Sequence, residues 1–147
     1  MSTAPRDRRA DGSPYPVRLD EIELRSRLNS LEYAVLREAA TERAWSQELE
    51  AAPNGSTTYS CRACGNELFT TNEKFDSQCG WPSFFSPLAG DRIEEVPDHS
   101  FGSTRTEVRC AACGSHLGHV FSGEGFNTPT DLRYCINAVA LRPSTNA

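Results

Sequence analysis

Apolar residues in the first part of the chain recur at helical spacing. Ile22, Leu24 and Leu28 predict a short helix. Asn29 followed by Glu32 is typical of a capping box, in which two side chains close the first turn of a helix. Apolar residues continue at the same spacing after this cap, so a second helix is expected. Both helices are expected to cover a core.

Beyond residue 57 the helical spacing disappears and short β-type runs follow one another. The runs are rich in β-branched and aromatic residues, and clusters of Gly, Pro and Asn separate them. The expected strands are Thr57 to Cys61, Glu67 to Thr70, Arg92 to Val96, Arg105 to Cys110, Leu117 to Phe121 and Arg133 to Leu141. A polar stretch from Ser46 to Thr57 is expected to be a surface loop. The pattern predicts a mainly β (α+β) fold, with an antiparallel β-sheet core and short N-terminal helices.

The length and composition suit one domain that works in a reducing compartment. A chain of 147 residues can bury a substantial core. Residues 1–17 are rich in Ser, Pro, Arg and Asp and predict a disordered leader, which leaves 18–147 as the folded domain. The start of the chain has no apolar run, so we expect no membrane segment and a cytoplasmic location. The net charge of -5 disfavours nucleic acid as a partner.

Two C-x-x-C-G turns stand at the ends of predicted strands and indicate a metal site. Their thiols belong to Cys61, Cys64, Cys110 and Cys113. Two such turns supply the four thiolates of a tetrahedral zinc ion, which leaves no open coordination position and makes the zinc structural. Iron in a rubredoxin-like site is the alternative metal. A thioredoxin-like redox pair is the alternative for each turn, but the βαβ pattern that accompanies such pairs is absent.

The two remaining cysteines, Cys79 and Cys135, are candidates for redox chemistry. Period-2 geometry places Arg133, Cys135 and Asn137 on one face of a strand, so a cation and an amide flank the thiol. Cys79 lies in a loop punctuated by Gly and Pro, where it can reach Cys135. Two thiols outside a closed metal site suit a nucleophile and a resolving partner. The alternative is a buried structural cysteine at 135 and a spare small residue at 79.

Aromatic and imidazole side chains accompany these thiols. Trp81 is either a core aromatic or a wall for a small apolar group such as a methyl. His116 and His119 follow the second C-x-x-C-G turn, where they are placed to serve as an acid and its supporting partner. In a regular strand the two rings face opposite ways. Either Gly118 therefore marks a bulge, or only one histidine enters the site.

Together these motifs resemble the B-type methionine sulfoxide reductases, the family that acts on the R epimer of methionine sulfoxide. Besides both C-x-x-C-G turns, the resemblance rests on Thr41 to Ala44, Phe75 to Phe84, Arg105 to Cys110, His116 to Phe121 and Arg133 to Asn137. The loop from Ser122 to Leu132 departs from the family pattern because it is longer and lacks the usual Gly- and Pro-rich form.

The resemblance implies a redox enzyme that repairs proteins under oxidative stress. It implies Cys135 as the nucleophile, which becomes a sulfenic acid, and Cys79 as the thiol that forms a disulfide with it. Further catalytic positions are His119, His116, Asn137 and Arg133, and substrate-binding positions are Trp81, Phe121 and Asp98. Substrates are proteins or peptides that carry methionine R-sulfoxide, thioredoxin is the reductant, and one structural zinc ion is held per chain. We expect a monomer that binds neither nucleic acid nor a membrane.

A binding module of a different class needs only the four metal ligands. Zinc-ribbon or β-fold modules similar to the Yippee-like proteins are the example. Such a module leaves the two extra thiols and their polar neighbours without a role, so the sequence favours the enzyme.

Overall fold

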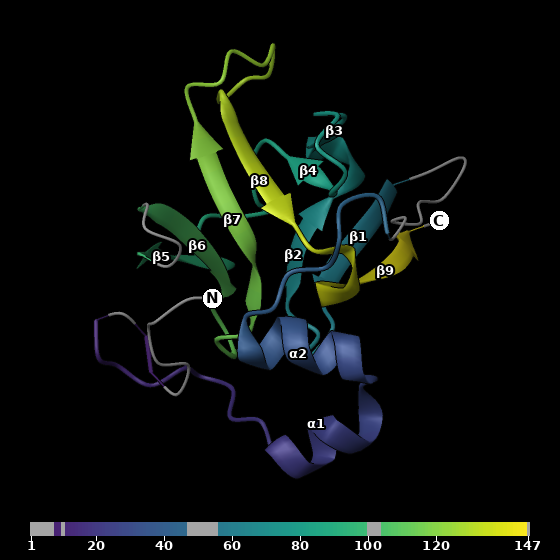
Figure 1. Cartoon of the computed structure of the whole chain (residues 1–147), viewed down its shortest axis with the longest axis vertical. Helices are drawn as coiled ribbons and strands as arrows, with labels where there is room; N and C mark the ends of the chain where they lie inside the picture. Colours follow the sequence, from purple (N-terminus) through teal and green to yellow (C-terminus); the bar gives the residue numbers. More distant parts are fainter. Residues whose placement is uncertain (1–7, 10, 47–55, 100–103, 147) are drawn as a thin grey trace.

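The fold consists of two antiparallel β-sheets, with two short helices at one end (Figure 1). The computed structural model describes residues 8–9, 11–46, 56–99 and 104–146. The smaller sheet has the order β2 (Glu67–Thr70), β1 (Ser56–Cys61) and β9 (Leu141–Asn146). The larger sheet has the order β3 (Lys74–Phe75), β4 (Ser83–Phe84), β8 (Leu132–Ile136), β7 (His116–Ser122), β6 (Arg105–Cys110) and β5 (Ile93–Asp98). The mainly β class predicted from the sequence is confirmed.

Both predicted helices form, and α2 has the predicted cap. Helix α1 spans Glu21–Arg27 and α2 spans Ser30–Glu38. The Asn29 side chain accepts from the Glu32 backbone N–H, and the Glu32 carboxylate accepts from that of Asn29. Leu24 is fully buried, whereas Ile22 is 81% exposed, so Ile22 does not contribute to the buried face of α1. Two residues along a helix correspond to a turn of about 200°, which places Ile22 opposite Leu24.

The predicted strand from Arg133 to Leu141 is wrong in extent, because the chain changes sheets within it. Strand β8 ends at Ile136, a 3-10 turn covers Ala138–Ala140, and Leu141 begins β9 in the smaller sheet. Asn137 stands at the break, where its side-chain N–H donates to the Leu117 carbonyl and its side-chain oxygen accepts from the Glu42 backbone N–H. These tertiary partners favour a turn that local β propensity does not indicate.

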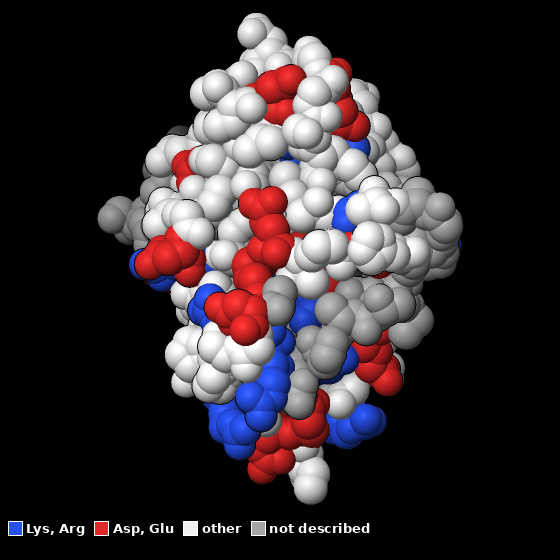
Figure 2. Space-filling model, turned by 90° about the vertical axis from the view of Figure 1, so that its left-hand side faces the viewer, with Lys and Arg blue, Asp and Glu red and all other residues white. Residues whose placement is uncertain are grey.

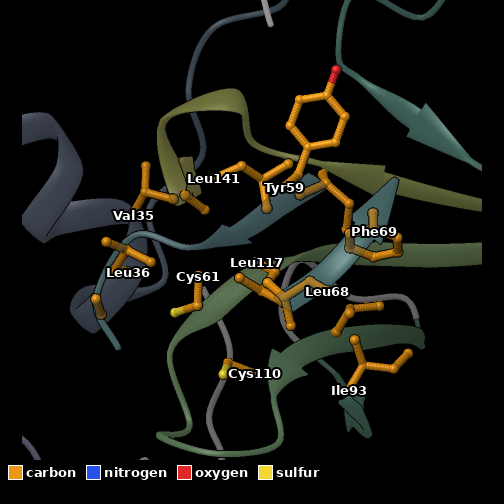
Figure 3. Close-up of a cluster of buried hydrophobic side chains, with 14 of the residues drawn as sticks. Val35, Leu36, Tyr59, Cys61, Leu68, Phe69, Ile93, Cys110, Leu117 and Leu141 are labelled. Atoms are coloured by element: carbon orange, nitrogen blue, oxygen red, sulfur yellow. The ribbon is translucent and has the colours of Figure 1, made fainter. Parts of the chain in front are cut away.

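The core fills the space between the two sheets and is closed at one end by α2. The rings of Phe69 and Phe84 stack across this space with their centroids 4.4 Å apart. Figure 3 shows Val35 and Leu36 of α2 at the edge of the cluster. The same view shows the sulfurs of Cys61 and Cys110, one from each sheet, facing the same side of the core. Cysteines expected to bind metal therefore also pack as part of the hydrophobic core.

The segment before α1 lies against the second C-x-x-C-G turn. The Val17 backbone N–H donates to the Ala112 carbonyl at 2.8 Å. Tyr15 is 6% exposed, and a Cβ on Gly114 would lie 2.5 Å from its ring. The expected boundary at residue 17 stays a prediction, since residues 1–7 and 10 lie outside the described residues. Most of the loop expected from Ser46 to Thr57 lies outside them as well.

Charges of both signs share the surface. On the face in Figure 2, acidic side chains form small groups from top to bottom, and basic side chains gather in the lower half. Within the described residues, no helix is both long and apolar enough to cross a bilayer.

Candidate active site and metal centre

Four cysteine sulfurs gather where two hairpins meet. The β1–β2 hairpin carries Cys61 and Cys64, and the β6–β7 hairpin carries Cys110 and Cys113. All four sulfurs lie within 4.8 Å of one another. The Cys61 and Cys113 sulfurs are 3.8 Å apart, and those of Cys64 and Cys110 are 3.6 Å apart.

These separations suit a tetrahedral metal ion. Zn–S bonds of about 2.3 Å in a tetrahedron place neighbouring sulfurs about 3.8 Å apart, whereas disulfide sulfurs lie about 2.05 Å apart. Because each hairpin belongs to a different sheet, an ion held here joins the two sheets. Four protein ligands leave no coordination position for a substrate, so the cluster suits a structural role.

Cys135 lies in the middle of the larger sheet, between β4 and β7. Ser83 of β4 pairs with Cys135 on one side, and His119 of β7 pairs with it on the other. Directly opposed residues of antiparallel strands point to the same face. The sheet therefore aligns a hydroxyl, a thiol and an imidazole in one row.

Cys79 reaches the same place from the loop between β3 and β4. Its sulfur lies 3.8 Å from the Cys135 sulfur. The Ser77 hydroxyl donates to the Cys79 sulfur at 2.9 Å, and the Ser83 hydroxyl lies 3.5 Å from it. The structure thus brings together the two thiols that the metal cluster leaves over.

The two thiols do not ionise alike. Burial and the neighbouring Cys79 thiolate raise the pKa of Cys135 to about 12, against a smaller opposite effect of Arg133. Burial also opposes ionisation of Cys79, but hydrogen bonds from Ser77 and Ser83 outweigh it and lower the pKa of Cys79. The first negative charge of the pair therefore resides on Cys79. The cation that flanks Cys135 in the sequence therefore does not make Cys135 the more acidic thiol of the pair.

Arg133 has less effect on Cys135 than the sequence suggests because a carboxylate engages it. Its guanidinium donates to both oxygens of Glu124, at 2.7 and 3.0 Å. Glu124 belongs to the loop that joins β7 to β8. The guanidinium also lies 4.5 Å from the centre of the Phe121 ring. Arg133 and Phe121 thus form one wall.

A pocket of about 190 Å³ opens over the thiols. The predicted residues that line it are Cys79, Trp81, His119, Phe121, Arg133, Cys135 and Asn137. Thr41, Arg105 and Gly118 also line it and were not predicted. The Trp81 indole N–H donates to the Glu42 carbonyl at 2.9 Å, which fixes the orientation of its ring. The pocket combines an aromatic wall with a polar floor, as small-molecule sites commonly do.

The two histidines lie on the same side of β7 because the strand contains a bulge. The register shifts so that Val108 pairs with Gly118 while the next residue, Arg109, pairs with His116. The sequence offered a bulge or a single histidine in the site as alternatives, and both hold, because His119 lines the pocket and His116 does not. The imidazole rings meet edge to face with their centroids 5.5 Å apart.

Each histidine is held by its own carboxylate. His119 lines the pocket, and its Nε2 lies 2.8 Å from an Asp98 carboxylate oxygen. His116 is 1% exposed, and its Nδ1 lies 2.7 Å from the Glu107 carboxylate. Asp98 therefore influences the pocket by positioning His119. His116 lies behind His119 and does not line the pocket.

Several supporting residues were missed from the sequence. Ser77 and Ser83 flank Cys79 closely, and their hydroxyls were a signal that could have been used. Glu107 of β6 points into the protein and is fully buried. A charged residue at an inward position of the predicted strand could have indicated a functional role for it. Glu42 gave no local signal because its partners, Asn137 and Trp81, lie far away in the sequence.

The chain is similar to known proteins over most of its length. The SelR domain matches residues 28–145. The chain is 49% identical over 127 residues to the peptide methionine sulfoxide reductase MsrB of Leifsonia xyli subsp. xyli, covering 86% of this chain and 90% of that protein. It is 50% identical over 132 residues to the protein of the same name from Burkholderia multivorans, covering 90% and 91%.

Proposed function

The chain belongs to the SelR-domain family of peptide methionine sulfoxide reductases, and on that premise we propose that it reduces methionine R-sulfoxide in proteins to methionine. Membership makes it an oxidoreductase that acts on methionine sulfoxide. The observation that carries the finer proposal is the pair of sulfurs of Cys79 and Cys135, 3.8 Å apart, beneath a pocket with an aromatic wall.

In the first step Cys135 attacks the sulfoxide sulfur. A proton passes from Cys135 to the Cys79 thiolate across the 3.8 Å that separates them, which leaves the thiolate on Cys135. The oxygen of the sulfoxide moves to Cys135 with a proton from His119, so that methionine leaves and Cys135 becomes a sulfenic acid.

His119 is the proposed acid for this step. It lines the pocket, pairs with Cys135 across the sheet, and is held in position by the Asp98 carboxylate. General-acid assistance typically contributes about 10²–10⁴-fold to a rate. Lowering a thiol pKa gains less, because nucleophilicity falls together with the pKa. The acid is therefore the larger contribution.

The remaining steps return both thiols to the reduced state. Cys79 attacks the sulfenic acid, water leaves, and a Cys79–Cys135 disulfide forms. Thioredoxin then supplies two electrons and is itself oxidised to a disulfide. This cycle needs reduced thiols, which is why we place the protein in the cytoplasm. All six cysteines are free in the structure.

The other expected properties belong to the same proposal. Trp81 and Phe121 form the apolar wall for the methyl group, while Asn137 and Arg133 hold polar parts of the substrate. One zinc ion on the four clustered cysteines joins the two sheets and takes no part in the reaction. We propose a monomer that works in oxidative-stress repair, with no nucleic acid or membrane as partner.

The test is stereochemical. A mixture of the R and S sulfoxides of a blocked methionine is incubated with the protein and dithiothreitol, and both epimers are followed by chiral chromatography. We expect loss of the R epimer alone and no loss with Cys135→Ser. Consumption of the S epimer contradicts the proposed specificity, and consumption of neither by a folded, metal-loaded protein favours the binding module.

A further inference from the structure

Trp45 is a large aromatic side chain left in solvent beside the redox thiols. It is 73% exposed and has a left-handed backbone with φ of 65°. Its backbone N–H donates to the Gly80 carbonyl at 2.8 Å. An indole that stays so exposed contributes little to stability through burial. The stability of the fold therefore does not explain why a large aromatic side chain stands at this position.

A second hollow, of about 410 Å³, is lined by Trp45 and by the loop that carries Cys79. Its apolar lining comes from Trp45, Phe75, Trp81 and Pro82, and Cys79 also lines it. Cys135 lines the substrate pocket but not this hollow. We call this hollow the Trp45 groove. Cys79 is thus exposed to two separate hollows, and Cys135 to one of them.

The conformation of the loop fixes the position of Cys79 at the groove. Cys79 lies between two left-handed residues, Gln78 with φ of 61° and Gly80 with φ of 90°. The Asp76 carboxylate accepts from the backbone N–H and the side-chain N–H of Gln78, at 2.9 and 3.1 Å. A Cβ on Gly80 would lie 2.9 Å from the Trp45 indole nitrogen. The indole is therefore seated directly on the Cys79 loop.

The geometry of disulfide exchange indicates a use for the groove. A thiolate attacks a disulfide sulfur along the extension of the S–S bond, so the attacking sulfur arrives opposite the leaving one. When Cys79 and Cys135 are joined by a disulfide, Cys79 can still be approached from the groove, which Cys135 does not line. A reductant in the groove therefore reaches Cys79 without entering the substrate pocket.

We propose that the Trp45 groove is the docking surface for the protein dithiol that reduces the Cys79–Cys135 disulfide, with Trp45 as its main contact. This inference rests on the proposed function. One thiolate of the partner attacks the Cys79 sulfur, the Cys79–Cys135 bond breaks, and Cys135 leaves as a thiolate. The second thiol of the partner then attacks its own mixed disulfide, which releases Cys79 as a thiolate and leaves the partner oxidised by two electrons.

The character of the groove suits a protein rather than a small thiol. A small thiol needs access to Cys79 but no aromatic contact outside it. Exposed Trp side chains beside a functional residue are typical anchors of protein interfaces. The charged residues that line the groove are Lys74 and Asp76, one of each sign, so apolar contact and not net charge governs docking.

The experiment compares two reductants on the same variants. Trp45→Ala is assayed for reduction of a peptide methionine sulfoxide with thioredoxin and with dithiothreitol. We expect the KM for thioredoxin to rise at least about 10-fold, while turnover with dithiothreitol changes less than about 2-fold. Trp45→Phe, which keeps an apolar ring, should show a smaller rise. Ile22→Ala is the matched control, since Ile22 is also exposed but belongs to α1, away from β3 and β4 in Figure 1.

The outcomes separate this inference from the proposed function. An unchanged KM for thioredoxin in Trp45→Ala overturns the docking surface, and so does an equal loss with both reductants, which marks Trp45 as a support of the loop. A wild-type protein that turns over with dithiothreitol but never with thioredoxin also overturns it. If the wild type reduces no sulfoxide with dithiothreitol, the proposed function itself fails.

Discussion

Cys79 and Cys135 share one negative charge, and its position decides how the site works. Burial and the neighbouring thiolate raise the pKa of Cys135, while the hydroxyls of Ser77 and Ser83 help to lower that of Cys79. In the resting enzyme Cys79 is therefore the base that can accept the proton of Cys135. A like charge at 3.8 Å should be measurable as coupling between the two titrations.

Replacing Cys79 should make Cys135 more acidic. In Cys79→Ser the neighbouring thiolate is gone, so we expect the pKa of Cys135 to fall below the value of about 12 that it has in the intact pair. The pH dependence of alkylation by iodoacetamide, with the modified residue identified by mass spectrometry, measures it. A Cys135 pKa that stays the same or rises in the variant contradicts the shared charge.

Glu42 is the least expected residue of the site. It is 2% exposed, and within the part of the chain that the structure describes its Oε2 has no hydrogen-bond partner. Its backbone binds Asn137 and Trp81, and its Oε1 accepts from the Val139 N–H at 3.0 Å. Glu42 thus connects Trp81 of the aromatic wall to the turn that follows β8 and Cys135.

Glu42 should make the protein less stable as the pH rises. Burial raises its pKa, and the N–H groups of Val139 and Ala138 offset this only in part. A raised folded-state pKa favours the protonated form, so stability is full below the ordinary value of 4.5 and is lost as the pH rises through the folded value. In Glu42→Gln the melting temperature should decline less between about pH 5 and pH 8.

The matched control is Glu38→Gln, at an exposed glutamate of α2. Its melting curve should follow that of the wild type over the same pH range. If Glu42→Gln also runs parallel to the wild type, Glu42 is ionised in the folded protein without cost, and the account of its burial is wrong.

At the scale of single residues, the sequence indicated the proposed reactive groups but not the residues that support them. Cysteine spacing and the His116 to Phe121 run were enough to select Cys135, Cys79 and His119. The partners Glu42 and Glu124 escaped because a carboxylate in sequence looks like an exposed charge. Their roles come from contacts across the fold.

Among the secondary-structure elements, β4, β8 and β7 build the site through their register. Gly118 of β7 lies so close to β8 that a Cβ would be 2.0 Å from the Cys135 carbonyl oxygen. Only a glycine permits this approach, because the obstacle is backbone and cannot rotate away. The contact keeps His119 directly opposite Cys135.

Gly118→Ala should therefore separate β7 from β8. We expect a loss of about 1–3 kcal/mol in the free energy of unfolding, together with a loss of activity as His119 moves away from Cys135. Urea unfolding and the rate of methionine release measure the two effects. Gly90→Ala is the control, since a Cβ there meets nothing within 4 Å. Equal stability of the two variants contradicts the close approach.

Most strands of four residues or more could be predicted from the sequence. Two-residue strands, and strand ends that depend on contacts with other elements, could not. The strands Glu67–Thr70 and Arg105–Cys110 were predicted with their observed bounds. Strands β3 and β4 have two residues each, too few for any periodicity to show. The end of β8 depends on Asn137, whose partners Leu117 and Glu42 belong to other elements.

For the molecule as a whole, the cysteine cluster links the two sheets at one end of the core. Each hairpin supplies two of the four sulfurs, so a metal ion bound by them would join one sheet to the other. Structural zinc binding contributes an apparent ~10–16 kcal/mol in small zinc domains, which is comparable with the ~5–15 kcal/mol of stability that a whole domain usually has. Loss of the metal should therefore affect the entire fold.

Removing one ligand tests this directly. Cys110→Ser should contain much less metal, melt at a sharply lower temperature and lose activity in proportion to unfolding. Cys79→Ser is the control, because Cys79 lies outside the cluster and its loss should leave metal content and melting temperature unchanged. A metal-free Cys110→Ser that is fully folded yet cannot bind substrate shows instead that the metal belongs to the chemistry.

The division of the six cysteines into four ligands and two redox thiols can be tested by counting methionine released without any reductant. One methionine per chain is expected from the wild type, with a Cys79–Cys135 disulfide as the other product. Cys79→Ser should also release one methionine per chain and retain a sulfenic acid on Cys135, and Cys135→Ser should release none. Methionine release by Cys135→Ser, or a disulfide between any other pair of cysteines in the wild type, contradicts the account.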